Sequence, residues 1–418
     1  MNHLLGFRTG DQSLVRDINL SLIMSRLIEH APLSRAGLAE TTGLNKSTVS
    51  SLVKQLLDLQ FVREVGFNLG GIGRPSVQLE INPNAGYIVS CELGVESIEV
   101  MFANFGAEVI WKRHEAIDAP DQQDAIIKQL LALLHEAVRV SELPCGHEGC
   151  LLGLAVGAPG LASAADGTLL FAPNLGWHDV PLQDLLQREF GDLAIFVENE
   201  ANMAALGEYF FGVAQGHREV LYLSAGVGLG GAIVRNGLLF KGATGYASEF
   251  GHMTLDPDGP LCNCQNRGCW ETFVSQRALF RLIRQAVEAG QPSALTGLAR
   301  GDLTALSIPL VVQAAEQGDR VALSALEEIG RYLGIGIASL VNGLNPDLVV
   351  LGGSLSLAGK FILPAVEAEV DHRALRWNRQ AASLKIAQHG TESCVMGGVA
   401  MVYQHILARP GNLERWNR

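Results

Sequence analysis

Apolar residues recur at helical spacing over the first part of the chain. Residues 17–30 place them three and four positions apart, which predicts an amphipathic helix that ends before Pro32. A second helix is expected after Ser34, whose side chain can cap it, and a third over about 46–59. Gly43 stands between these two helices and can take the left-handed backbone conformation of a tight turn. This spacing is typical of a helix-turn-helix.

Two segments of alternating apolar and polar residues follow the three helices and predict a pair of strands. The segments are 61–65 and 76–81, and the glycine-rich residues 66–75 between them predict a flexible tip that carries Arg74. Helices followed by a two-stranded wing indicate a winged helix-turn-helix over residues 1–82, which is a DNA-binding module. A protein-interaction module of the same fold is the alternative.

Polar residues at the starts of the second and third helices are the candidate DNA contacts. The first turn of a recognition helix enters the major groove, and an arginine at a wing tip can enter a minor groove. Because one head offers few base contacts, we expect a homodimer on a two-fold operator site. The candidate DNA-binding residues are Ser34, Arg35, Asn45, Lys46, Ser47, Thr48, Ser50 and Arg74.

The remainder of the chain alternates between strand and helix patterns twice. Each half opens with a strand, a glycine-containing turn and another strand, at 87–110 in the first half and at 219–234 in the second. We therefore expect an α/β fold whose body is a duplicated α/β unit with a central cleft, where ligands bind at the carboxyl ends of strands. The expected first half comprises residues 86–200 with 383–408, and the second comprises 201–382.

Composition and charge narrow the classes of function. The chain has 418 residues, 48% of them hydrophobic and 18% charged, which is enough for two or three domains with large cores. It has no apolar stretch of about 18 residues and no pattern of a signal peptide at its start, so we expect a cytoplasmic protein without a membrane span. The net charge is −12, yet residues 1–75 carry +2, so DNA contact would be confined to the head.

Three of the seven cysteines fall within eight residues, ten positions after a histidine. His252, Cys262, Cys264 and Cys269 could supply three thiolates and one imidazole to a tetrahedral zinc ion. In a reducing compartment such a cluster is expected to bind a metal ion and not to form a disulfide. We therefore predict one structural Zn²⁺ per chain, since four protein ligands leave no open position for water. A fortuitous cluster of thiols is the alternative.

Four motifs in the body, in the same order along the chain, resemble the ROK family of repressors, open reading frames and sugar kinases. They are segments 198–208, 223–231, 249–252 and 262–271. The resemblance covers roughly residues 86–400 and implies an actin/hexokinase-like fold for the body. With the winged helix in front, the whole chain is most similar to ROK repressors of the xylose type.

The resemblance also implies a sugar site. In the family, sugar hydroxyls are held by an Asn–acidic pair, by the Glu and His of a Glu-x-Gly-His motif, and by the Glu after the last cysteine. In this sequence, with a further asparagine from Pro-Asn-Leu-Gly-Trp, the residues are Asn174, Asn199, Glu200, Glu249, His252 and Glu271. One ring nitrogen of His252 can bind zinc while the other faces a hydroxyl.

Two departures from the family pattern argue against sugar kinase activity. Kinase members have Asp-x-Gly-Gly-Thr at the phosphate turn, whereas this chain has Glu92-Leu-Gly94-Val95-Glu96. A carboxylate at this turn repels a polyphosphate. The position of the catalytic Asp holds Glu200, which is one methylene longer and displaces the base. We therefore expect no catalytic residues.

These observations favour a sugar-responsive transcriptional repressor of carbohydrate utilisation. The expected partners are operator DNA and a small sugar, with xylose the first candidate, and sugar binding in the cleft is expected to release DNA. One alternative is an active ATP-dependent sugar kinase with an accessory DNA-binding domain. Another is a regulator whose effector is a phosphotransfer protein or another partner.

Overall fold

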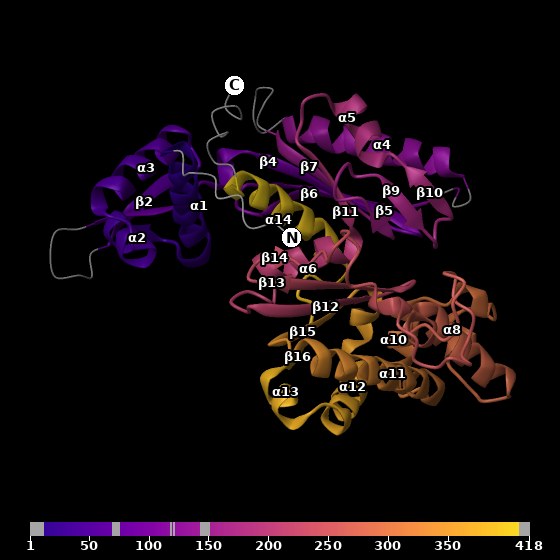
Figure 1. Ribbon diagram of the computed structural model, residues 1–418. Coiled ribbons are helices and arrows are strands. Elements are labelled where there is room, and N and C mark those ends of the chain that lie inside the picture. Colours follow the sequence, from indigo (N-terminus) through magenta and orange to yellow (C-terminus); the bar gives the residue numbers. More distant parts are fainter. Residues whose placement is uncertain (1–11, 69–75, 118, 120–121, 143–150, 409–418) are drawn as a thin grey trace, which may run out of the picture.

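The computed structural model describes residues 12–68, 76–117, 119, 122–142 and 151–408. The N-terminal head lies at one end of the molecule, and two α/β lobes form the body (Figure 1). The expected fold class is confirmed, because each lobe contains a five-stranded mixed sheet flanked by helices. Among the described residues, no helix is both long enough and apolar enough to cross a membrane.

The head contains the three predicted helices and the predicted wing. The helices are α1 (Gln12–His30), α2 (Arg35–Thr42) and α3 (Lys46–Asp58), and the sheet has the order β1 (Leu33–Ser34), β3 (Ser76–Ile81), β2 (Val62–Asn68). The side chain of Ser34 caps α2 by accepting from the backbone of Gly37, and that of Asn45 caps α3. Gly43 has a φ of 71°, as the turn requires.

The first sheet of the body has the order β11-β7-β4-β5-β6. The three parallel strands are β4 (Tyr87–Leu93), β7 (Leu151–Ala158) and β11 (Ile195–Asn199), with β11 at the edge. Strands β5 (Ser97–Asn104) and β6 (Val109–Ala116) extend the sheet beyond β4 in antiparallel fashion. Alternate residues of its strands face two different helices. Ile88 and Met101 share a core with α14 (Ser393–Ala408), whereas Val89 and Phe102 share one with α4 (Gln123–Glu142).

The second sheet repeats this plan with the order β14-β13-β12-β15-β16. Its strands are β12 (Glu219–Ala225), β13 (Leu229–Arg235), β14 (Leu238–Leu239), β15 (Leu348–Gly352) and β16 (Ser383–Ile386). The long helix α11 (Arg320–Leu344) packs against α12 (Gly359–Arg373) and α8 (Gln276–Glu288) beside it. The assignment of 383–386 to the first half was wrong, because β16 pairs in parallel with β15. From the stretch 383–408, helix α14 packs on the first sheet, against β4, β5 and β7.

Helix α6 (Glu200–Phe211) lies between the two sheets and contacts α14, β12 and β13. Shorter elements complete both lobes. These are β8 (Leu161–Ala162), β9 (Leu169–Ala172), β10 (Trp177–Val180), α5 (Leu182–Phe190), α7 (Glu271–Val274), α9 (Leu295–Leu298), α10 (Ile308–Glu316) and α13 (Arg376–Ala381).

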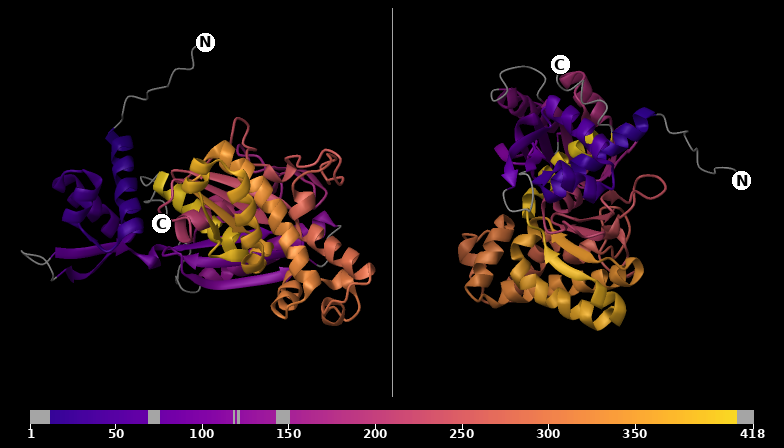
Figure 2. Two further views of the ribbon diagram at one scale, coloured as in Figure 1. Left: turned by 90° about the horizontal axis from the view of Figure 1, so that it is seen from below. Right: turned by 90° about the vertical axis from the view of Figure 1, so that its left-hand side faces the viewer.

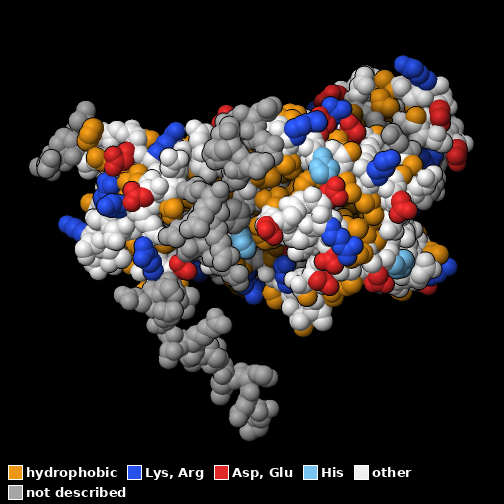
Figure 3. All heavy atoms as spheres, turned by 90° about the horizontal axis from the view of Figure 1, so that it is seen from above, with side chains coloured by type: hydrophobic (Ala, Val, Ile, Leu, Met, Phe, Trp, Pro, Cys, Tyr) orange, Lys and Arg blue, Asp and Glu red, His pale blue; other side chains and the backbone are white. Residues whose placement is uncertain are grey.

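The head packs directly on the body and is not merely tethered to it. It lies beside the C-terminal helix α14 in both views of Figure 2. Buried residues of the head, such as Leu20 and Leu79, belong to the same hydrophobic cluster as Val399 and Ile406 of α14. On the face that Figure 3 shows, acidic and basic side chains are interspersed over head and body.

Candidate functional site

A cavity of about 800 Å³ lies between the two lobes, where strands of both sheets end. Glu92 at the end of β4 and Asn199 at the end of β11 line it from the first sheet, and the β12–β13 turn lines it from the second. The volume lies within the range of about 300–1,000 Å³ that is usual for ligand pockets. All six residues proposed for sugar binding line this cavity: Asn174, Asn199, Glu200, Glu249, His252 and Glu271.

Asn199 and Glu200 stand where β11 becomes α6. The Asn199 side-chain oxygen caps the helix by accepting from the backbone nitrogens of Ala201 at 2.9 Å and Asn202 at 3.1 Å. Its amide nitrogen donates to the carbonyl of Gly160 at 2.9 Å, which leaves one amide hydrogen for a ligand. Glu200 is in the first turn of α6, where the helix dipole favours a negative charge.

Buried carboxyl groups give the cavity its electrostatic character. Burial, and then the charge of Glu200, raise the pKa of Glu92 to about 8. Burial, and then the charge of Glu249, raise the pKa of Glu200 to about 7. Burial also raises the pKa of Glu249 above its ordinary value. Carboxyl groups that share protons near neutral pH can both donate to and accept from hydroxyls, which suits a neutral, hydroxyl-rich ligand.

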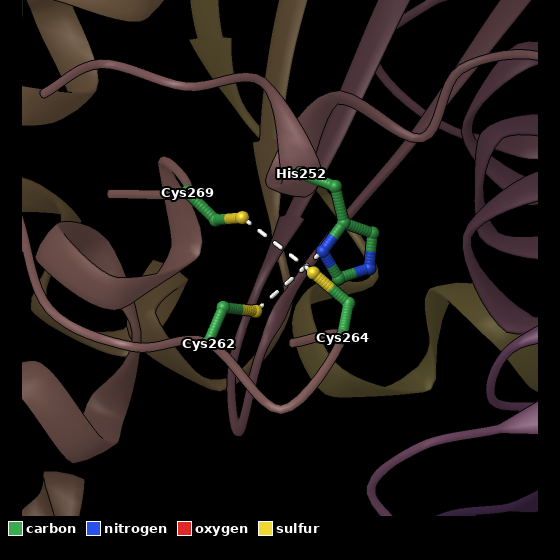
Figure 4. A group of neighbouring side chains, drawn as sticks. All are labelled: His252, Cys262, Cys264 and Cys269. Atoms are coloured by element: carbon green, nitrogen blue, oxygen red, sulfur yellow. Dashed lines mark hydrogen bonds between the residues drawn. The ribbon is translucent and has the colours of Figure 1, made fainter. Parts of the chain in front are cut away.

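The four predicted metal ligands converge beside the cavity (Figure 4). Their ligand atoms all lie within 4.8 Å of one another. The Sγ atoms of Cys264 and Cys269 are 3.6 Å apart, and Cys262 Sγ is 3.7 Å from His252 Nδ1. In a tetrahedral zinc site with bonds of about 2.0–2.3 Å, neighbouring ligand atoms lie about 3.6–3.8 Å apart. The cluster therefore fits a metal ion such as zinc.

His252 belongs to both the metal cluster and the cavity lining, and Glu271 of the cavity lining contacts the cluster through Cys262. The Nδ1 atom of His252 points toward the sulfurs and its Nε2 points away from them (Figure 4). Cys262 Sγ donates to Glu271 Oε1 at 2.8 Å. Burial and then this hydrogen bond raise the pKa of the Cys262 thiol, so a metal ion has to displace its proton.

Asn174 connects the two lobes across the cavity. Its side-chain oxygen accepts from Asn263 Nδ2 at 3.0 Å and from Arg277 Nη1 at 3.3 Å. Asn174 follows β9 in the first lobe, whereas Asn263 lies in the cysteine loop of the second lobe and Arg277 lies on α8. The oxygen of this predicted sugar contact is therefore engaged in a bridge, although its side chain does line the cavity.

A second bridge lies at the glycine-lined end of the cavity. Gln276, at the start of α8, donates to Glu96 Oε1 of the β4–β5 turn at 3.1 Å. Its amide oxygen accepts from Ser354 Oγ at 3.4 Å, and its backbone nitrogen donates to the carbonyl of Gly226 at 2.8 Å. Gln276 thus joins the carboxylate of Glu96 to the glycine turn between β12 and β13. Gln276 and Arg277 belong to none of the four motifs, so no sequence signal marks either residue as part of the site.

The glycine turn also fits closely around the acidic residues. A Cβ atom on Gly228 would lie 2.8 Å from Glu271 Oε2 and 3.4 Å from Asn174 Nδ2. A side chain at this position would displace the carboxylate of Glu271 and would touch the amide of Asn174. Gly228 therefore leaves room for the Glu271 carboxylate in the cavity and also forms part of the turn between β12 and β13.

The candidate DNA-binding residues of the head fall into two groups. Ser34 and Asn45 cap helices, and Arg35 pairs with Glu64 of the wing at 3.2 Å. Lys46, Ser47 and Ser50 are exposed on α3, and Thr48 is half-buried. Their backbone and side-chain hydrogen bonds are local, since Ser47 Oγ donates to Asn45 Oδ1 and Ser50 Oγ to the carbonyl of Lys46. Arg74 lies outside the described residues.

Comparisons with known proteins agree with this architecture. Residues 88–405 match the model of the ROK family. Two proteins from Caldicellulosiruptor species are 39% and 33% identical over 401 residues each, which is 96% of this chain and 99% of theirs. The second, from Caldicellulosiruptor bescii, is named as a xylose repressor.

Two solved structures resemble the chain, one over nearly its whole length and the other over about three quarters of it. A ROK family transcriptional regulator, a homolog of the E. coli MLC protein, is 26% identical, covers 97% of this chain and 100% of its own, and has a TM-score of 0.81. A ROK family glucokinase from Streptomyces griseus in complex with glucose and AMPPNP is 32% identical and has a TM-score of 0.69. It covers 76% of this chain and 100% of its own.

Proposed function

The chain belongs to the ROK family, and on this basis we propose that it is a sugar-responsive DNA-binding repressor of carbohydrate-utilisation genes. The xylose repressor and the ROK transcriptional regulator match nearly the whole length of this chain, including the head. The glucokinase matches 76% of it. The observation that carries the proposal is the convergence of six polar side chains on one cavity of a protein that also has a winged helix.

We propose that the effector is a neutral sugar, with xylose as the first candidate. The relatives named as xylose repressors support this choice. The cavity-lining carboxyl groups of Glu200 and Glu249, whose pKa values are raised, suit hydroxyls, whereas they and Glu96 would repel a phosphorylated sugar. Sugar binding between the lobes would favour one lobe arrangement, and a dimer whose heads are set by that arrangement would release its operator.

We also propose one structural zinc ion per chain, held by His252, Cys262, Cys264 and Cys269. When bound, such an ion supplies rigidity to the loop and no open coordination position for chemistry. A thiolate ligand has no proton to donate, so Glu271 Oε1 would be free to accept from a sugar hydroxyl instead of from Cys262. His252 Nε2, which points away from the sulfurs, would be free in the same way.

Sugar kinase activity is the second candidate function, because the chain resembles a glucokinase over its body and keeps the glycine turn at Gly226 to Gly231. Against it, Glu96 of the β4–β5 turn lines the cavity and is hydrogen-bonded to Gln276, whose backbone nitrogen donates to the carbonyl of Gly226 in the glycine turn. ATP-dependent phosphorylation of a sugar by the purified protein would establish this alternative.

A calorimetric screen of pentoses and hexoses against the purified protein tests the main proposal. It is repeated with an operator duplex that the protein has selected from random DNA. We expect one or a few sugars to bind, without turnover of ATP, and to weaken operator binding. Absence of binding by every sugar at millimolar concentration would contradict the proposal.

A further inference from the structure

Helix α6 extends from the cavity to the joint between body and head. Glu200, its first residue, lines the cavity. Phe211, its last residue, packs edge-on against Tyr403 of α14, with ring centroids 5.7 Å apart. One short helix therefore has the proposed sugar site at one end and a contact toward the head at the other.

Helices α6 and α14 are in direct backbone contact. A Cβ atom on Gly207 of α6 would lie 2.8 Å from the backbone nitrogen of Gly397 of α14. The fully buried carboxylate of Glu208 accepts from Ser393 Oγ at 2.9 Å and from the backbone nitrogen of His389 at 2.8 Å. Close packing and a buried, hydrogen-bonded carboxylate resist sliding, so the two helices move as one unit.

A series of aromatic rings continues from this unit into the head. Tyr403 stacks on Phe105, with centroids 4.6 Å apart and planes 9° from parallel. Phe105 packs edge-on against Phe61 of the head at 5.2 Å. Phe61 and Phe105 are completely buried, and Tyr403 is nearly so. We name Phe211, Tyr403, Phe105 and Phe61 the aromatic column.

The same helix also faces the second lobe. Met203 and Ala204 of α6 share a hydrophobic cluster with Val220 and Tyr222 of β12 and with Ala232 of β13. Any change in the angle between the lobes must therefore be accommodated along α6. Because interiors are closely packed, such a change shifts the packed neighbours of α6 as discrete bodies.

We propose that the α6–α14 unit and the aromatic column transmit sugar binding to the DNA-binding head. This inference rests on the proposed function and adds its route: the lobes act on α6, α14 moves with it, and Phe105 passes the displacement to Phe61. No residue of the aromatic column lines the cavity, and none belongs to the exposed face of α3. Their replacement should therefore reduce the coupling between the two binding events more than either event alone.

The test compares full-length Phe105→Leu and Tyr403→Leu with Tyr403→Phe, which keeps the ring. For each, the dissociation constants for D-xylose alone, for the selected operator alone, and for the operator with saturating D-xylose are measured. If the screen ranks another sugar first, that sugar replaces D-xylose. Phe190→Leu, which alters a ring of α5 beside His135 in the first lobe, is the matched control.

The coupling is the ratio of the operator dissociation constant with saturating sugar to that without sugar. We expect this ratio to be at least threefold smaller in Phe105→Leu and Tyr403→Leu than in the wild type. The constant for D-xylose alone and the constant for the operator alone should each change less than twofold, and Tyr403→Phe and the control should retain the wild-type ratio. If a leucine variant unfolds below the assay temperature, Phe105→Met replaces it, because the flexible methionine side chain fills an irregular space without a ring. Wild-type coupling in the ring-less variants overturns the inference. A wild type that responds to no sugar instead overturns the proposed function.

Discussion

Gly336 of α11 leaves the space that the indole ring of Trp270 occupies, and a Cβ atom at this glycine would overlap the ring. The indole nitrogen of Trp270 donates to the carbonyl of Tyr332, one turn earlier on the same helix, at 2.9 Å. Trp270 directly follows Cys269 and precedes Glu271, and it is completely buried. The loop that carries the metal cluster is therefore anchored on α11 by one side chain.

Gly336→Ala should destabilise the protein, although alanine favours a helix by about 0.5–1 kcal/mol over glycine. The added methyl forces the indole out of its site, which typically costs about 1–3 kcal/mol for an overpacked core. Thermal unfolding should show a lower Tm, and the metal content should fall. Gly343→Ala, in the same helix with no atom within 4 Å of its added Cβ, should leave both unchanged or slightly improved. Equal behaviour of the two variants would contradict the anchoring role.

Glu249→Ala should abolish the sugar response and leave operator binding without sugar intact. Glu249 lines the cavity and lies in the body, not in the head. Loss of a carboxyl partner of sugar hydroxyls should weaken sugar binding at least tenfold by calorimetry. Glu288→Ala, at the exposed end of α8, provides the control and should keep the wild-type affinity. A retained response in Glu249→Ala would remove this residue from the site.

Cys264→Ser should lower the metal content measured on the purified protein and, with it, the sugar affinity. Cys264 Sγ lies 3.6 Å from Cys269 Sγ, and a hydroxyl is a poor substitute for a thiolate on zinc. Cys91→Ser, at a cysteine outside the cluster, controls for loss of a thiol as such. Full metal content in Cys264→Ser would show that this cysteine is not a ligand.

The acidic cavity should make stability fall as pH rises. Glu92 and Glu200 have pKa values raised from 4.5 to about 8 and about 7, so between pH 4.5 and 8 the folded state holds more protons than the unfolded state. Stability is thus greatest below about pH 4.5 for these groups and is lost as pH rises through 7 and 8. Other groups titrate as well, so the measurement is the difference between the wild type and Glu92→Gln. The Tm of Glu92→Gln should fall less between pH 5 and pH 8, and identical slopes would count against the prediction.

Lys46→Ala should weaken operator binding and reduce its salt dependence. Lys46 is exposed at the start of α3. If it contacts one phosphate, the slope of log K against log salt should become less steep by about 0.9. Lys128→Ala, on exposed α4 of the body, should keep the wild-type slope. An unchanged slope in Lys46→Ala would place the DNA elsewhere.

Local chemistry could be predicted from the sequence. The cap at Ser34 and the turn at Gly43 depend on neighbours a few residues away, and the structure confirms both predictions. The metal cluster was predictable for a similar reason, since its ligands span only eighteen positions. Contacts that form only after folding could not be predicted.

The bridge from Asn174 to Asn263 and Arg277 joins residues about ninety to one hundred positions apart, and nothing local marks it. Residues 383–386 join the sheet whose edge strand is available to pair with them, which here is β15 of the second sheet. A four-residue strand carries too little pattern to settle that choice.

The position of α14 has a consequence for biosynthesis. This helix is the last described element of the chain, yet it covers one face of the first sheet and packs against α1 of the head. At about 5–20 residues per second, a ribosome needs roughly 15–60 seconds to go from the end of the head to α14. During that interval the head can fold but its partner surface does not yet exist. A nascent chain therefore carries a DNA-binding module that is not yet under the control of the body.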